Sequence, residues 1–187
     1  MNEINEMKGP HDGVSDGVDL GSYVEQEGRP AVRFVRTYPH SIERVWGAIT
    51  EPGELRQWFP FHTVIEPLVG GVVTFSGNPH MPEFTGCVLV YEPPRRLAFS
   101  WGDSELRFEL EALEGGRCRL TLIDVLEAAD MAARNGAGWN MCLRELDKLL
   151  AGSETSGLHS TASRSWQEYY DSYVAAGIPH GAAIPGH

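Results

Sequence analysis

Residues 131–150, MAARNGAGWNMCLRELDKLL, are the one long amphipathic stretch of this chain, and they follow a run of short strand-like segments. At 100° per residue one face collects its apolar side chains, as in a helix with one buried side: Trp139, Cys142, Leu143, Leu146, Leu149 and Leu150. The same face, extended toward the helix start, has Asn135 near its centre and Gly136 beside it. Such a helix must pack on a sheet. A gap under its first turns would be a pocket.

The preceding segments alternate with a period of two, which is typical of half-buried strands. Six strands are predicted, at residues 64–68, 72–75, 84–91, 96–101, 105–113 and 117–125. Alternation is clearest in 105–113, where Leu106, Phe108, Leu110 and Ala112 are expected to face inward. Because the connections are short, neighbouring strands should be antiparallel.

A strand at 31–38, with a candidate edge strand at 21–25, comes before two short helices. Ser41 is a good cap for the first helix, and Pro52 suits the start of the second. The order strand, two short helices, six strands and long helix predicts an α+β helix-grip (START-like) fold. In this fold a curved antiparallel sheet wraps around the long C-terminal helix.

The chain divides into three predicted regions. Residues 1–19 are polar and glycine-rich and are expected to be a disordered tail. Residues 20–152 would form the helix-grip domain. Residues 153–187 would contain a polar linker, a short amphipathic helix at 166–174 and a turn-rich tail.

Composition narrows the classes of function. A net charge of −11 argues against nucleic-acid binding. No apolar run approaches the roughly 20 residues that a membrane-spanning helix needs, and no signal peptide is visible. Three cysteines, Cys87, Cys118 and Cys142, lack a C-x-x-C spacing and are expected to be buried free thiols. These features favour a cytoplasmic protein.

No nucleophile, phosphate-binding or dinucleotide-binding motif occurs in the sequence, and the histidines lack metal-ligand spacing. We therefore expect neither a metal nor a cofactor. His62, after an aromatic corner, would either close a helix through a hydrogen bond or serve a site. Glu66, Glu83 and Asp124 could face the interior, but each lies near a turn or strand end, where exposure is the commoner outcome. No catalytic residue is identified.

Aromatic side chains are abundant in the segments that should line one interior. Such rings are usually core, but large rings that interdigitate poorly would leave a ligand pocket. The candidate ligand-binding residues are Trp46, Trp58, Phe84, Phe99, Trp101, Asn135, Trp139 and Cys142. Asn135 would be either a pocket-facing hydrogen-bonding group or a helix-start residue. Asn140 and Asp147 are expected at the solvated edge of the helix.

Four sequence pieces carry a resemblance to a known family: PHSIERVWGAITEPGELRQWFP, VIEPLVGGVVTF, VYEPPRRLAFSWG, and AARNGAGWNMCLRELDKLL with Trp166 and Tyr173 after it. Together they resemble the activator of heat-shock-protein-90 ATPase-like branch of the START/polyketide-cyclase (SRPBCC) superfamily. The resemblance implies a helix-grip fold with a deep cavity between sheet and long helix. Relatives include lipid binders, cyclases and co-chaperone domains.

Three functions are therefore open. The first is binding of a hydrophobic or aromatic small molecule in that cavity, without catalysis. The second is a cyclase- or aromatase-like enzyme acting on a polyketide-type substrate, which would need a buried acid or base. The third is a co-chaperone-like interaction module, in which residues 166–174 dock on a protein partner or on a second copy to form a homodimer.

Overall fold

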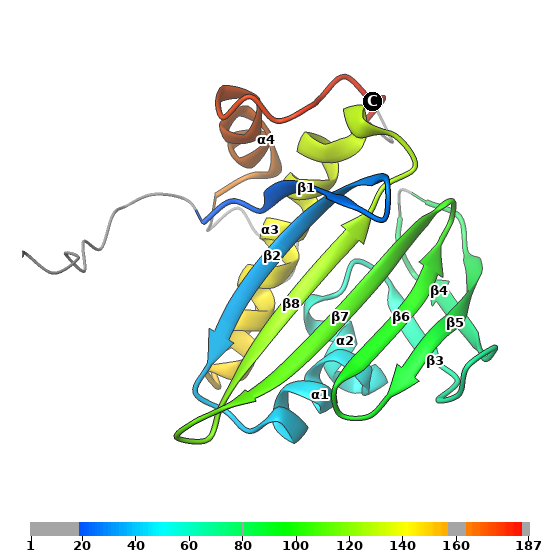
Figure 1. Cartoon of the computed structure of the whole chain (residues 1–187), viewed down its shortest axis with the longest axis vertical. Helices are drawn as coiled ribbons and strands as arrows, with labels where there is room; N and C mark the ends of the chain where they lie inside the picture. The colour runs from blue at the N-terminus through cyan, green and yellow to red at the C-terminus, as the bar shows by residue number, and fades with distance from the viewer. Residues whose placement is uncertain (1–18, 80, 157–163, 185–187) are drawn as a thin grey trace, which may run out of the picture.

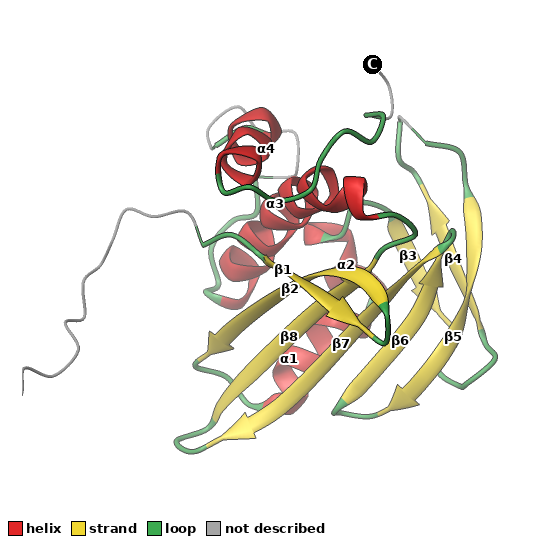
Figure 2. Ribbon diagram, turned by 45° about the horizontal axis from the view of Figure 1, so that its top comes forward, coloured by secondary structure: helices red, strands yellow, loops and turns green. Residues whose placement is uncertain are grey.

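The structure is a computed structural model that describes residues 19–79, 81–156 and 164–184. Apart from Asp19, the predicted N-terminal tail lies outside the described residues, as does much of the predicted linker. One antiparallel sheet curves around the helices, which all lie on its concave side or beyond it (Figures 1 and 2). This confirms the predicted helix-grip fold.

Eight strands and four α-helices make up the described fold. The strands are β1 (Ser22–Gln26), β2 (Arg29–Tyr38), β3 (His62–Ile65), β4 (Val72–Ser76), β5 (Phe84–Glu92), β6 (Arg96–Trp101), β7 (Ser104–Leu113) and β8 (Arg117–Val125). The helices are α1 (Ile42–Thr50), α2 (Pro52–Trp58), α3 (Ala132–Leu150) and α4 (Trp166–Ala175), with a 3-10 turn, η1 (Ala129–Met131), before α3.

The sheet order is β1-β2-β8-β7-β6-β5-β4-β3. The chain starts at one edge with the β1–β2 hairpin, and α1 and α2 then carry it to β3 at the opposite edge. From there a meander of short turns returns it strand by strand to β8, beside β2. β8 therefore lies in the middle of the sheet and leads directly into α3 (Figure 1).

Local chemistry fixes the two short helices. The Ser41 side chain accepts a hydrogen bond from the Arg44 amide and caps α1, and Pro52 begins α2. The Trp58 indole at the end of α2 donates to the Ala48 carbonyl at 2.9 Å. This bond ties the two helices together, so that the aromatic residues after α2 enter the interior at a defined place.

α4 packs on the first half of α3. Tyr173 is fully buried there, and a Cβ atom added at Gly136 would lie 2.7 Å from its ring. Glycine at position 136 is therefore what lets the tyrosine approach the helix. The Tyr173 hydroxyl accepts from the Gly21 amide at 2.7 Å and donates to Asn140 Oδ1 at 2.5 Å. Tyr169 and Tyr173, within the segment that was one candidate for docking on a partner, thus pack inside their own chain.

Some details differ from the sequence predictions. Cys87 is exposed, because it points outward from β5 while its neighbour Val88 points inward. Ala112 is exposed near the end of β7, although Cys118 opposite it on β8 is buried. Asn140 is 5 % exposed rather than solvated, because Tyr173 covers it.

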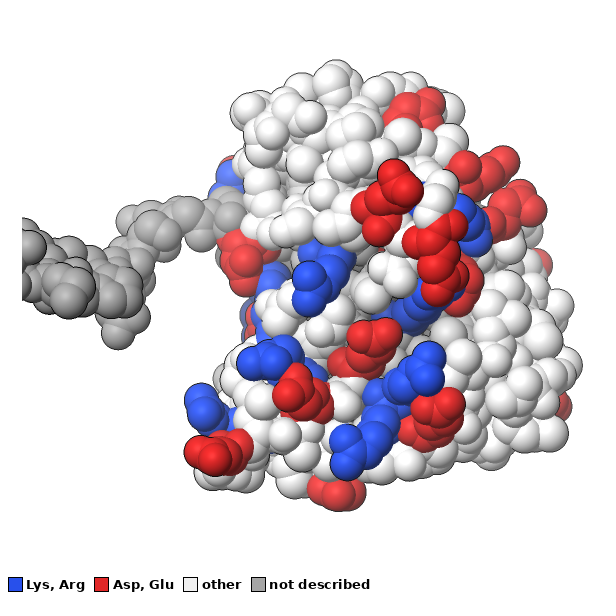
Figure 3. Space-filling view, viewed as in Figure 1, with Lys and Arg blue, Asp and Glu red and all other residues white. Residues whose placement is uncertain are grey.

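The outer face of the sheet mixes acidic and basic side chains over β2, β8 and β7 (Figure 3). Several of these basic groups are paired: Arg107 with Glu27 and Glu105, and Arg119 with Glu111. The charges of Arg107 and Arg119 are thus neutralised locally. Among the described residues, no helix is both long and apolar enough to cross a membrane.

Candidate functional site

An aromatic cluster fills the space between the sheet and the first half of α3. Its centre is Phe59, just after α2, whose ring lies 5.5 Å from Trp101 and 5.7 Å from Trp139, centroid to centroid. Phe75 stacks on Phe84 at 4.6 Å. The remaining members are Trp58, Phe61, Phe99 and Phe108. The rings contact one another throughout.

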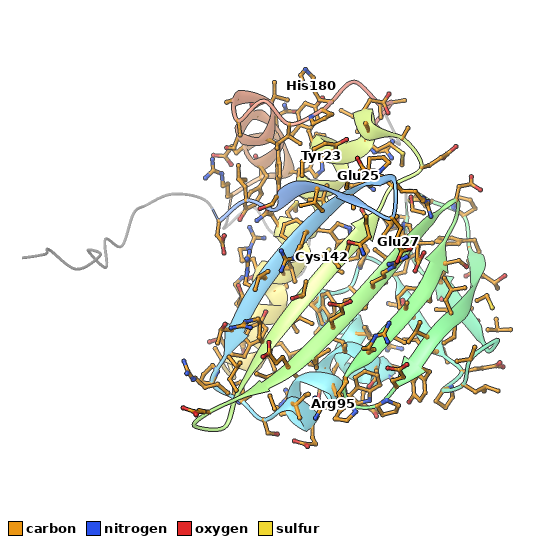
Figure 4. The ribbon with its side chains drawn as sticks, in the orientation of Figure 1. Tyr23, Glu25, Glu27, Arg95, Cys142 and His180 are labelled. Atoms are coloured by element: carbon orange, nitrogen blue, oxygen red, sulfur yellow. The ribbon has the colours of Figure 1, made fainter. Side chains whose placement is uncertain are left out.

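Five of the eight predicted ligand-binding residues are brought together in this cluster: Trp58, Phe84, Phe99, Trp101 and Trp139. Trp46 lies apart, with Tyr91 as its ring neighbour at 5.7 Å. Cys142 is buried on α3 one turn after Trp139, behind the sheet as seen in Figure 4. Burial raises the pKa of its thiol to about 12, so it stays protonated.

Asp124 is a buried carboxyl group at the edge of this cluster. Because alternate side chains of a strand lie on the same face, Asp124 lies on the inner face of β8 with Leu120 and Leu122, and it is 1 % exposed. Its neighbours across the sheet are Val32 on β2 and Leu106 on β7, both fully buried. An acid is therefore held in an apolar row of the sheet, directly beneath α3.

Two side chains of α3, one helical turn apart, hold one oxygen of that carboxyl. The Asn135 amide and the Trp139 indole both donate to Asp124 Oδ2, at 2.9 and 3.0 Å. Arg134 donates to Asn135 Oδ1 at 3.1 Å and so orients the amide. The other oxygen, Asp124 Oδ1, is buried without a hydrogen-bond partner among the described residues.

This arrangement changes the acidity of Asp124. Removal from water disfavours the charged form and raises the pKa of the carboxyl to about 6, although the hydrogen bonds from Asn135 and Trp139 act in the opposite direction. Near neutral pH the group can therefore hold or release a proton. Because Oδ2 already accepts two N–H bonds, the proton belongs on Oδ1.

Asn135, for which two roles were considered, lies within the first turn of α3, and its amide donates to an interior acid. Asp124 was expected to be exposed because it is near a strand end, and this was wrong. The signal available in the sequence was the alternation along the strand, which places Asp124 on the same face as Leu120 and Leu122. Glu66, Glu83 and His62 are exposed.

Two hollows of the described surface lie elsewhere. One, of about 340 Å³, is on the outer face of the sheet between Arg95 and Thr121. The other, of about 350 Å³, lies where α3, β2 and the segment around α4 meet. Neither is lined by the aromatic cluster. Among the described residues, no group of three or more histidine, cysteine and acidic side chains is placed to hold a metal ion.

The fold and this site define a helix-grip domain with an aromatic interior and one buried acid. The model of the family "Activator of Hsp90 ATPase homolog 1-like protein" matches residues 39–151, and the chain belongs to this family. A search of curated proteins finds no match.

Solved structures share this fold. CalU16 from Micromonospora echinospora is 27 % identical, with a TM-score of 0.62 over 79 % of this chain and 87 % of that one. A conserved protein of unknown function from Enterococcus faecalis, EF2215, is 20 % identical, with a TM-score of 0.69 over 87 % and 92 %. The protein encoded by BPP1335 of Bordetella parapertussis is 23 % identical, with a TM-score of 0.62 over 95 % and 100 %.

Proposed function

We propose that this protein binds a hydrophobic or aromatic small molecule between the sheet and the first half of α3, with Asp124 as the polar anchor. The observation that carries the proposal is the unpartnered Asp124 Oδ1, buried beside a cluster of large rings. A buried acceptor without a partner is costly and rare in native proteins. A ligand hydroxyl that donates to Oδ1 would remove that cost.

The cluster also suggests where a ligand enters. Phe84 and Trp101 are only partly buried, whereas Phe59, Phe75 and Trp58 are not accessible. The rings therefore reach the surface on the side of β5 and β6. Because the rings contact one another, a bound ligand must part them and replace ring–ring contacts with ligand–ring contacts of similar energy. Binding to this interior would then be coupled to a small opening of the grip.

A matched pair of probes tests the proposal: 2-naphthol, which has a hydroxyl donor, and naphthalene, which has none. We expect saturable binding of both by equilibrium dialysis, with 2-naphthol bound about tenfold more tightly, as one buried hydrogen bond to a charged group would give. Trp101→Ala should weaken both probes. Asp124→Ala should remove only the preference for the hydroxyl.

The exposed variant Glu109→Gln, on the outer face of β7, is the matched control and should bind as the unaltered chain does. Absence of saturable binding of either probe up to its solubility would refute ligand binding at this site. Equal affinities for the two probes in the unaltered chain would refute the anchoring role of Asp124.

A second candidate function is favoured by the same acid. A cyclase- or aromatase-like enzyme needs a buried group that exchanges protons near neutral pH, and Asp124 has a pKa of about 6. Asp124 would take a proton from a carbon between two carbonyl groups. That carbon would then attack a third carbonyl carbon, whose oxygen would receive the proton. A synthetic poly-β-ketone tests this: turnover that Asp124→Asn abolishes supports the enzyme, whereas binding without turnover supports a binding protein.

A further inference from the structure

The polar hollow of about 350 Å³ lies on a different face of α3 from the aromatic cluster. α3 contributes Asn140, Arg144 and Asp147, which share one helix face at spacings of four and three residues. The segment that begins α4 contributes Arg164 and Tyr169, and β2 contributes Arg36. The family match covers residues 39–151, so the hollow is built partly from residues outside that match.

Two arginines at this hollow have donors that the described residues leave unused. Arg144 Nη2 and Arg164 Nε are both buried, and neither has a hydrogen-bond partner. Other donors hold each side chain in place: Arg144 Nη1 bonds to the Arg164 carbonyl at 3.0 Å and Arg144 Nε to Glu145 Oε1 at 3.4 Å, and Arg164 Nη2 bonds to Ser172 Oγ at 2.8 Å. A guanidinium cannot lose its proton at neutral pH, so an unused buried donor calls for an acceptor.

The charges around the hollow indicate which acceptor fits. Three arginines and two aspartates line the hollow, and Arg144 also pairs at 3.4 Å with the buried Glu145, which Lys148 contacts at 2.9 Å. Counted together, these groups leave one positive charge in a protein whose net charge is −11. Asp19 already pairs with Arg36 at 2.6 Å, and Asp147 already accepts from the Tyr38 hydroxyl at 2.8 Å. One surplus positive charge matches a monoanion better than a dianion.

We propose that this hollow binds a small organic acid through its carboxylate, independently of the aromatic interior. Arg144 and Arg164 would share the carboxylate, because a planar fork of N–H groups suits its two oxygens. The ring of Tyr169, over which the Arg164 guanidinium lies at 5.3 Å, would pack against the apolar part of the acid. A volume of about 350 Å³ is at the lower end for ligand sites, which favours an acid the size of one aromatic ring.

Benzoate tests this proposal, with benzamide as its neutral counterpart of the same shape. In the full-length chain labelled with ¹⁵N, we expect benzoate to shift the Nε resonance of Arg164 saturably and benzamide to leave it in place. Arg164→Gln and Arg144→Gln should each weaken benzoate binding at least tenfold, since each removes one charge-assisted contact. Arg117→Gln, at an exposed turn where that side chain donates only to the Glu114 carbonyl, should not change binding.

Three results would overturn the proposal: no saturable shift with benzoate, equal shifts with benzoate and benzamide, or tighter binding of inorganic phosphate than of benzoate. Should Arg164→Gln unfold α4, the comparison of benzoate with benzamide in the unaltered chain still decides the matter, because it needs no substitution. The naphthol experiment on the interior is unaffected by any of these outcomes, since it reports on the other face of α3.

Discussion

Replacement of the buried acid by its amide, Asp124→Asn, should change how the stability of the protein depends on pH. The pKa of Asp124 is about 6 in the folded chain, against an ordinary value of 3.8. The folded state therefore binds a proton more tightly than the unfolded state between pH 4 and 6. The contribution of Asp124 to the free energy of unfolding must therefore fall as the pH rises through this range.

The magnitude follows from the same two values. Each unit of difference in pKa corresponds to about 1.4 kcal/mol, so ionisation of Asp124 should cost about 3 kcal/mol of stability between pH 4 and 7. In the Asp124→Asn variant the new amide could still accept from the Asn135 and Trp139 side chains through its oxygen, but it has no charge to bury. In that variant this loss should be absent.

The assay is urea unfolding followed by tryptophan fluorescence at pH values from 4 to 8. Other acids contribute their own pH dependence, but they are the same in both proteins and cancel in the difference between the two curves. Asp103→Asn, at the exposed β6–β7 turn, is the control and should follow the unaltered chain. Parallel curves for Asp124→Asn and the unaltered chain would show that Asp124 does not titrate in this range, and the acid–base reasoning would fail with it.

Three further substitutions or labels test the surroundings of the site. Gly136→Ala should lower the melting temperature, because the new Cβ would lie 2.7 Å from the buried Tyr173 ring. Gly138→Ala, with open space around it, should instead raise the free energy of unfolding by up to about 1 kcal/mol. Similar effects of the two substitutions would contradict the close packing of α4 on α3. Tyr173→Phe should cost about 1–3 kcal/mol and speed hydrogen exchange at the Gly21 amide, which loses its acceptor; unchanged exchange would contradict that bond. A thiol reagent should label Cys87 quickly in the folded protein and leave Cys142 unreacted until unfolding, because Cys142 is buried and its pKa is raised to about 12. Rapid labelling of Cys142, located by peptide mapping, would show that α3 opens readily.

Much of the fold could be predicted because it depends on local patterns. The period-two alternation in residues 105–113 and the helical period in 131–150 predict β7 and α3 closely. Short turns then leave a meander as the simplest arrangement. The edge position of β3 is harder to predict, because it depends on where α1 and α2 deliver the chain, and that is set by long-range packing such as the bond from Trp58 to Ala48.

The candidate site was predicted less completely, and the reason is physical. Aromatic residues could be assigned to the interior from their periodicity, but which rings meet depends on the curvature of the sheet. Trp46 and Trp101 carry the same signal, yet only Trp101 joins the cluster. Asp124 was predicted to be exposed because it lies near a strand end, although the alternation along β8 places it on the inner face. The face on which the side chain lies is the better guide here, because β8 is flanked by β2 and β7 and the inner face at its end is covered by α3.

The first half of α3 shows why small residues in a helix do not by themselves indicate a pocket. A gap beneath the first turns of the helix, where Asn135 and Gly136 lie, was considered as a pocket. Gly136 instead receives Tyr173 of α4, so that space is filled by a side chain from a distant segment. The Asn135 amide donates to Asp124. The site proposed for a ligand is therefore not a gap left by small residues but one buried oxygen, Asp124 Oδ1, without a partner among the described residues and beside closely packed rings. A ligand of the proposed kind would need a donor for that oxygen as well as an apolar body.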